Sequence, residues 1–292
     1  MLDLSSISKR AEQLRILTLD VTVRGEAAGH AAFDDECRRN VYSASKSFTS
    51  IAVGMAQDEG LLSVDERVRD AFSEVEGAGR VPESLTVRHL LTMSMGQESP
   101  LLMGSDRPKI RESDWAKEVF SHPFVYEPGT RFLYTNAGPY LAGLLVQKRA
   151  GVDLVDFLMP RLFEPLGIPR PTWETDPMKR TFGAGGLMLT GRELHLFGRL
   201  MLQEGSWQGR QLVSTAYVKE ALSCHILTGR GSEGYGYLFW LGENGSMRAD
   251  GKYGQLSVIF PALQAVVTVT AESRHPQEIL DAIDRELVPQ FS

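Results

Sequence analysis

The sequence predicts an α+β fold: an antiparallel sheet built from both ends of the chain, flanked by helices, plus a mostly helical inserted domain. Near the N-terminus, Ile16–Val23 alternates apolar and polar residues, as a half-buried strand does. Near the C-terminus, Leu256–Phe260 and Ala265–Thr270 read as two strands around a turn at Pro261. Between the two ends, apolar residues recur at helical spacing instead. Strands from both ends are therefore expected to share one sheet.

The remaining elements follow from local patterns in chain order. A second strand is expected near Gly29–Phe33, another at Tyr235–Leu241, and a third at Met247–Asp250 after a turn at residues 243–245. Helical spacing, with glycine or proline between the segments, predicts helices at Ser43–Glu59, Leu85–Met95, Ser113–Ser121, Asn136–Ala150, Asp153–Phe163, Gly191–Gln203 and Glu278–Leu287.

These elements divide into two expected domains, in line with a length of 292 residues. Residues 1–72 and 186–292 are expected to form the sheet domain, and residues 73–185 the mostly helical one. An active site is expected in the cleft between them, because ligand sites form preferentially at such junctions.

The composition is that of an ordinary globular protein, with 42% hydrophobic residues and a net charge of -6. This acidic balance argues against a nucleic-acid partner. The N-terminal segment has no signal-peptide pattern, and the longest apolar stretch, Tyr140–Val146, is too short to cross a membrane. We therefore expect a cytoplasmic protein with no membrane partner and of unknown oligomeric state. Cys37 and Cys224 have no metal-ligand spacing and are expected to be buried thiols.

A candidate nucleophile lies at the start of a predicted helix. Lys46 follows Ser43 by one turn and lies about 60° around the helix axis from it. A lysine whose pKa is depressed by burial can accept the proton of such a serine. The spacing alone is weak evidence, because Ser6 and Lys9 repeat it in a polar segment and an N-cap serine beside a solvated lysine has the same pattern.

Two further motifs supply groups that can act with this serine. A Pro-Gly turn delivers Tyr134 and Asn136 to the start of the next helix. Lys252, Tyr253 and Gly254 enter a strand, where the lysine adds a second cation and the glycine permits close approach of a ligand to the backbone.

In this order, the three motifs resemble those of the serine β-lactamase and penicillin-binding-protein superfamily: Tyr-Ser-Ala-Ser-Lys-Ser-Phe-Thr-Ser, Leu-Tyr-Thr-Asn and Lys-Tyr-Gly-Gln. The Tyr-x-Asn form resembles the class C branch, which also contains serine esterases and D-aminopeptidases. The resemblance covers roughly Ile16–Val288 and implies a β-lactamase/transpeptidase-like fold.

The resemblance also implies a role for each residue. Ser43 would attack a carbonyl to form an acyl-enzyme, and Lys46 would help to deprotonate it. Tyr134 would act as general base and then protonate the leaving group, with its phenol pKa lowered by Lys46 and Lys252. Asn136 would orient Lys46 or a substrate amide. The backbone N–H groups of Ser43 and Gln255 would form the oxyanion hole.

Departures from the family pattern favour an esterase or amidase acting on a small ester or amide. Tyr253 replaces the usual small hydroxyl residue of the third motif, and no export signal is visible. The alternatives are β-lactamase or D-alanyl-D-alanine carboxypeptidase-like activity, or a non-catalytic ligand-binding relative. Neither a metal nor an organic cofactor is required by this chemistry.

Other motifs are interpreted as structural. Gly229-x-Gly231-x-x-Gly234 matches a dinucleotide-binding fingerprint as a string, but an aromatic strand follows it, which favours a loop. His89 and His195 lie within predicted helices and are expected to be hydrogen-bonded or surface side chains.

Overall fold

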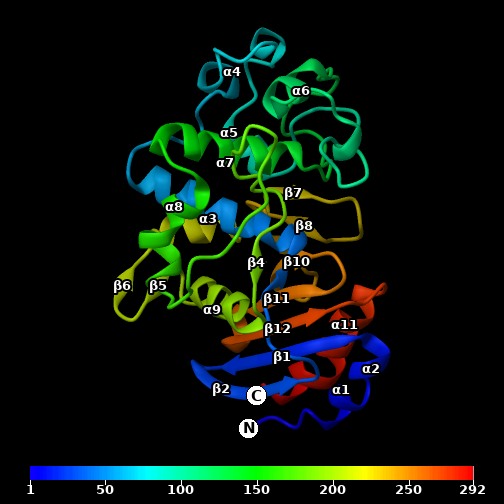
Figure 1. Cartoon of the computed structure of the whole chain (residues 1–292). Coiled ribbons are helices and arrows are strands. Elements are labelled where there is room, and N and C mark those ends of the chain that lie inside the picture. Colours follow the sequence, from blue (N-terminus) through cyan, green and yellow to red (C-terminus); the bar gives the residue numbers. More distant parts are fainter. Residues whose placement is uncertain (292) are drawn as a thin grey trace.

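A computed structural model describes residues 1–291 and confirms the α+β fold. Its centre is an antiparallel sheet of eight strands in the order β2-β1-β12-β11-β10-β9-β8-β7 (Figure 1). The strands are β1 (Ile16–Val23), β2 (Glu26–Ala32), β7 (Ile226–Leu227), β8 (Gly234–Tyr235), β9 (Trp240–Leu241), β10 (Met247–Gly251), β11 (Gln255–Phe260) and β12 (Ala265–Ala271). The first and last strands of the chain are therefore neighbours, and both termini lie at the same end of the molecule (Figure 1).

Strand β1 is buried on both faces, which corrects the prediction of a half-buried strand. Its two threonines are buried and form hydrogen bonds in the interior: the hydroxyls of Thr18 and Thr270 lie 2.7 Å apart, and that of Thr22 lies 2.7 Å from Nε2 of His195. The alternation of apolar and polar residues in β1 therefore indicates two covered faces of different polarity, not one covered face and one exposed face.

Helix α9 (Gly191–Leu202) covers the polar face of these strands. It approaches the sheet closely because two of its residues are glycines: a Cβ at Gly191 would lie 2.2 Å from Oγ1 of Thr18, and one at Gly198 would lie 2.2 Å from Oγ of Ser257. The opposite face is apolar. It packs against the terminal helices α1 (Ser5–Lys9), α2 (Ala11–Leu14) and α11 (Pro276–Ala282), the last of which continues through a π-helical turn, Ile283–Leu287.

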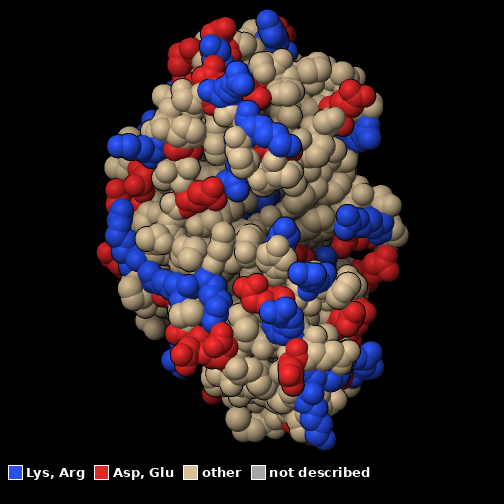
Figure 2. Space-filling view, turned by 45° about the vertical axis from the view of Figure 1, so that its right-hand side comes forward, with Lys and Arg blue, Asp and Glu red and all other residues tan. Residues whose placement is uncertain are grey.

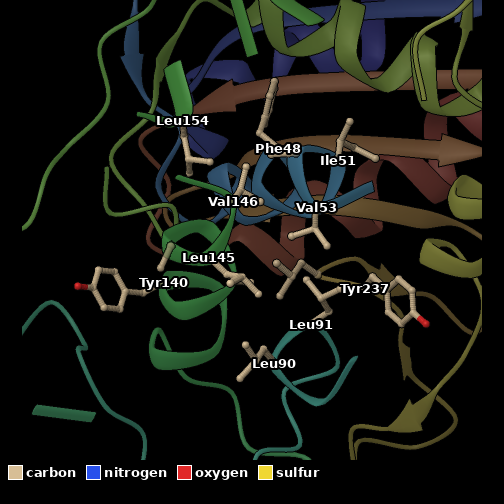
Figure 3. Close-up of a cluster of buried hydrophobic side chains, with 14 of the residues drawn as sticks. Phe48, Ile51, Val53, Leu90, Leu91, Tyr140, Leu145, Val146, Leu154 and Tyr237 are labelled. Carbon is tan, nitrogen blue, oxygen red and sulfur yellow. The ribbon is translucent and has the colours of Figure 1, made fainter. Parts of the chain in front are cut away.

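The centre of the molecule is helix α3 (Ser45–Asp58), which is buried on all sides rather than along one stripe. It packs against α7 (Ala137–Ala150), which in turn contacts α5 (Val87–Leu91). Figure 3 shows side chains of all three helices meeting in one apolar cluster. Because α3 runs through this core, the residues at its N-terminus are held inside the protein. The other helices of this part are α4 (Val68–Ala71), α6 (Trp115–Ser121), α8 (Leu154–Leu158) and α10 (Thr215–Ala221).

Several predicted elements differ from the structure. The expected strand Tyr235–Leu241 is a hairpin, because Leu238 adopts a left-handed φ of 63° and the chain folds back between β8 and β9. The predicted helix Leu85–Met95 ends at Leu91, close to Met93 with a φ of 56°. The segment Asp153–Phe163 divides into α8 and a π-helical turn at Met159–Phe163.

The surface also corrects one prediction. Cys37 and Cys224 are exposed free thiols, not buried ones, because both lie in loops outside the two apolar clusters. Acidic and basic side chains are interspersed over most of the face seen in Figure 2. Across residues 1–291, none of the helices has the length and apolar character that crossing a membrane requires. The predicted domain boundaries at residues 72 and 186 stay a prediction.

Candidate active site

Ser43 lies in a 3₁₀ turn, Tyr42–Ala44, that leads directly into α3. The α-helix therefore begins two residues later than predicted. The residue before this turn is anchored to a segment distant along the chain: the backbone N–H of Val41 donates a hydrogen bond of 2.9 Å to the carbonyl of Leu187. Tyr42 has a left-handed φ of 46°, which reverses the chain just before Ser43.

Lys46 is 1% exposed and has no carboxylate partner among the described residues. Its Nζ lies 2.9 Å from Oγ of Ser43 and donates hydrogen bonds of 2.7 Å to Oδ1 of Asn136 and 2.6 Å to the carbonyl of Ala184. Burial and, to a smaller extent, the positive charge of Arg107 lower the pKa of Lys46 to about 7. At neutral pH, Lys46 is therefore a neutral amine in a large fraction of the molecules.

Asn136 is placed to hold Lys46 rather than to face the solvent. It is 8% exposed at the start of α7, and its Nδ2 donates a hydrogen bond of 2.9 Å to the carbonyl of Leu102. With the amide nitrogen engaged there, the amide oxygen is left to accept from Lys46. Of the two roles expected for Asn136, its contacts are those of a residue that orients the lysine.

Tyr134 completes the group around Ser43. Its ring stacks on Trp240, with centroids 5.3 Å apart, and Nζ of Lys46 lies 5.1 Å from the centroid of the Tyr134 ring. Burial raises the pKa of Tyr134 above its usual value, and the interaction with the Ser43 side chain opposes this only in part. The expectation of a phenol pKa lowered by Lys46 and Lys252 is therefore wrong, because burial sets the direction of the shift.

The third motif forms the turn between β10 and β11. Lys252 is exposed, and its Nζ lies 4.7 Å from the centroid of the Tyr253 ring. Tyr253 and Gly254 both have a left-handed φ, of 69° and 92°, so that Gln255 enters β11 directly after the turn. Among residues 1–291, Lys252 has no carboxylate within ion-pair distance, and it adds an exposed cation to the cavity wall.

A cavity of about 1130 Å³ opens in front of Ser43. Tyr134 and Lys252 line it beside the serine, whereas Asn136, Tyr253 and Gly254 are not among the described residues of its wall. Its wall includes the apolar side chains of Met103, Phe132 and Trp240. It also includes residues of α11, among them Gln277 and Glu278.

The wall opposite α11 carries a charged cluster that sequence reasoning did not predict. Arg248 donates hydrogen bonds of 2.9 Å to Asp250 and 2.9 Å to Glu233, so its charge is neutralised by two carboxylates. The guanidinium also lies 5.7 Å from the centroid of the Trp240 ring. The Arg-x-Asp pair just before the third motif is the one sequence signal that could have indicated this cluster.

The other motifs have structural roles. Gly229 and Gly231 lie in the loop between β7 and β8, as expected, and Gly234 begins β8. His195 is buried between Thr22 and Thr268, and His89 bonds to Thr86 at the start of α5. Among residues 1–291, no group of three or more His, Cys, Asp or Glu side chains is arranged to hold a metal ion.

Ser43 and Tyr134 line one cavity, and the buried Lys46 contacts Ser43 from behind its wall. This arrangement agrees with a comparison to known families. Residues 17–288 match the Beta-lactamase family model. The chain belongs to the Beta-lactamase family. The match covers both the sheet and the helical part, so it includes every residue of the candidate site.

Relatives of this chain within the family include hydrolases. It is 31% identical over 150 residues to lovastatin esterase of Penicillium rubens, a match that covers 43% of this chain and 37% of that enzyme. It is 27% identical over 263 residues to 6-aminohexanoate-dimer hydrolase of Paenarthrobacter ureafaciens, covering 81% of this chain and 67% of that enzyme. The match to lovastatin esterase thus spans little more than a third of that curated relative.

Solved structures show the same fold. A putative 6-aminohexanoate-dimer hydrolase from Bacillus anthracis superposes with a TM-score of 0.81 at 19% identity, over 98% of this chain and 81% of that one. At this level of identity the similarity establishes the β-lactamase/transpeptidase-like fold alone.

Proposed function

We propose that the protein is a serine hydrolase that cleaves a small ester or amide through an acyl-enzyme on Ser43. The observation that carries this proposal is the contact of 2.9 Å between Oγ of Ser43 and Nζ of Lys46, a lysine buried without a carboxylate. A nucleophile with an adjacent base that is itself oriented by a third group, here Asn136, is the arrangement that covalent catalysis needs.

Lys46 is proposed as the base for acylation. As a neutral amine it takes the proton of the Ser43 hydroxyl while Oγ bonds to the substrate carbonyl carbon. The negative charge that develops on the carbonyl oxygen is accepted by the backbone N–H groups of Ser43 and Gln255. Tyr134 does not serve this step, because a phenol whose pKa is raised by burial stays protonated.

Tyr134 is proposed as the proton donor to the leaving group. Its hydroxyl proton passes to the departing oxygen or nitrogen as the carbonyl–leaving-group bond breaks, and the Lys46 ammonium returns a proton to the phenol. Water then attacks the acyl-enzyme with the same groups acting in reverse, and Ser43 recovers its proton. The cycle balances without a metal or an organic cofactor.

The apolar wall supports an acyl group without charge. Met103, Phe132 and Trp240 line the same cavity as Ser43, and the acyl part of a substrate is proposed to rest against them. An esterase or amidase of small molecules is therefore ranked above a β-lactamase, a D-alanyl-D-alanine carboxypeptidase or a non-catalytic binding protein. A cytoplasmic location is proposed with it, because the exposed free thiols Cys37 and Cys224 suit a reducing compartment, and cell fractionation tests it.

Reaction with a fluorophosphonate, followed by intact-protein mass, tests the nucleophile without knowledge of the substrate. One adduct is expected on the wild type, mapping to the peptide that contains Ser43, and none on Ser43→Ala. Ser6→Ala is the matched control, because Ser6 and Lys9 have the same spacing in helix α1. Absence of an adduct from the folded wild type would favour the non-catalytic alternative.

Initial rates on a short-chain ester, a D-alanyl dipeptide and a cephalosporin then rank the substrate classes. The ester is expected to be turned over fastest. A cephalosporin rate well above the ester rate would replace the esterase proposal by the β-lactamase alternative.

A further inference from the structure

Two tyrosines outside the cavity join the nucleophile turn to the third motif. The rings of Tyr42 and Tyr253 meet edge to face, with centroids 5.4 Å apart and planes at 77°. This is a favourable geometry for an aromatic pair. Tyr42 immediately precedes Ser43, and Tyr253 lies two residues before Gln255. The pair therefore connects the two segments that carry the proposed oxyanion-hole amides.

Both tyrosines stand in a backbone conformation that side chains disfavour. Their φ angles are 46° for Tyr42 and 69° for Tyr253, in the left-handed region that suits glycine. Such conformations persist only where the surroundings enforce them, and they concentrate at functional sites. A glycine at either position would be less strained, so the ring has to contribute something that glycine lacks.

Hydrogen bonds hold each tyrosine backbone from its own side. The N–H of Tyr42 donates 2.7 Å to Oδ1 of Asn40, and its carbonyl accepts 2.5 Å from Oγ of Ser45. The carbonyl of Tyr253 accepts 2.9 Å from the N–H of Ser273. Each segment is thus fixed to its neighbours, and the ring contact joins one fixed segment to the other.

The backbones of the two segments also touch directly. A Cβ at Gly251, the last residue of β10, would lie 2.2 Å from the carbonyl oxygen of Val41. Glycine at this position lets the strand approach the nucleophile turn. The edge contact of Tyr42 and Tyr253 then sets the separation on the other side of the same junction.

We propose that Tyr42 and Tyr253 are positioning residues, a clamp that sets the spacing between the backbone amides of Ser43 and Gln255. The proposal rests on the proposed function, in which those amides form the oxyanion hole. Neither ring is among the described residues that line the cavity, so the clamp acts through the backbone and not by contact with substrate. An oxyanion hole displaced by about 1 Å costs up to about a hundredfold in rate.

The test measures kcat and KM on a short-chain ester for Tyr42→Ala, Tyr253→Ala and the double variant. Each single variant is expected to lower kcat about 10- to 100-fold with KM within about threefold. The double variant is expected to lose little more than either single one, and Tyr253→Phe to recover most of the loss. Tyr253→Leu is measured beside Tyr253→Ala, because it keeps apolar bulk without the ring if alanine unfolds the protein.

Tyr126→Ala is the matched control. Tyr126 is a partly exposed tyrosine with Arg131 4.5 Å from its ring centroid, much as Lys252 lies over Tyr253, but it is not part of the described cavity wall. Its loss is expected to leave kcat within about twofold of the wild type. Unchanged kcat in both clamp variants, or an equal fall in the control, would overturn the proposal.

Amide hydrogen exchange separates this proposal from the proposed function. Tyr253→Ala is expected to speed exchange in the peptide that contains Tyr42 and Ser43, although the substitution lies in the other segment. If exchange in the Tyr42–Ser43 peptide becomes faster but the wild type hydrolyses no substrate, the positioning role of the two tyrosines is retained and the proposed hydrolase activity is rejected. Unchanged exchange there would reject the clamp whatever the activity.

Discussion

The amine of Lys46 lies 2.9 Å from the hydroxyl oxygen of Ser43 and donates hydrogen bonds to Asn136 and Ala184, with no carboxylate of residues 1–291 within ion-pair distance. A lysine held in this way has no ion pair to keep it charged, so burial decides its protonation. This relationship separates the Ser43 motif from its copy at Ser6, and the predictions on catalysis start from it.

Activity is expected to fall on the acid side of pH 7. Burial lowers the pKa of Lys46 to about 7, and only the neutral amine accepts the serine proton. The fraction of active enzyme therefore rises with pH through about 7 and is lost tenfold per pH unit below it. A profile of kcat/KM on a neutral ester measures this limb, and a flat profile from pH 5 to 8 would exclude Lys46 as the base.

Arg107→Gln is expected to shift that acid limb to higher pH. The charge of Arg107 lowers the pKa of Lys46, and its removal also leaves Glu174, its ion-pair partner, unneutralised. Both changes favour protonated Lys46, so activity at pH 6 falls more than activity at pH 9. Arg131→Gln removes a cation stacked on Tyr126 and serves as control. An equal loss at both pH values would indicate a structural defect instead.

Tyr134→Phe is expected to discriminate between leaving groups. The variant keeps the ring that stacks on Trp240 but lacks the hydroxyl that protonates the leaving group. Hydrolysis of an alkyl ester should fall about 10²- to 10³-fold, whereas a 4-nitrophenyl ester, whose leaving group needs no proton, should lose less than about tenfold. Lys46→Met should lose both activities. Equal losses for both esters in Tyr134→Phe would instead assign Tyr134 to the attack step.

His195 is expected to make the fold sensitive to acid. It is buried between Thr22 and Thr268, and burial lowers its pKa from 6.5 to about 3. Its contribution to stability is complete above pH 6.5 and is lost progressively as the pH falls toward 3, by about 5 kcal/mol. Urea unfolding of His195→Gln should show a weaker decline over that range. His122→Gln, at a histidine with a 42% exposed side chain, should retain the wild-type slope.

The motifs identified from sequence meet in the structure because three distant segments end at one place. Ser43 and Lys46 stand at the start of α3, Tyr134 and Asn136 precede α7, and these two helices pack together in the core. Residue spacing within each motif was enough to identify the candidate side chains. Family resemblance was needed to bring them together, since no local pattern encodes contacts across the chain.

What sequence reasoning missed depends on neighbours distant along the chain. The pKa of Tyr134 was expected to fall beside two cations, but its burial against Trp240 reverses the direction. No sequence pattern around Arg107 indicates that its charge lowers the pKa of Lys46. The hairpin within Tyr235–Leu241 was missed because its aromatic residues suit a strand, while the left-handed Leu238 is set by the hydrogen bond from its N–H to the carbonyl of Leu91.

The pairing of β1 with β12 has a consequence for biosynthesis. A ribosome releases β1 and β2 early, but a two-stranded hairpin alone is marginally stable in water. Its next neighbour in the sheet, β12, is synthesised only much later, because Thr18 and its partner Thr270 are separated by 252 positions. Such distant pairing makes folding slow and leaves the early strands open to wrong partners. The hairpin of β1 and β2 therefore stays without its neighbouring strand in the sheet until β12 has been synthesised.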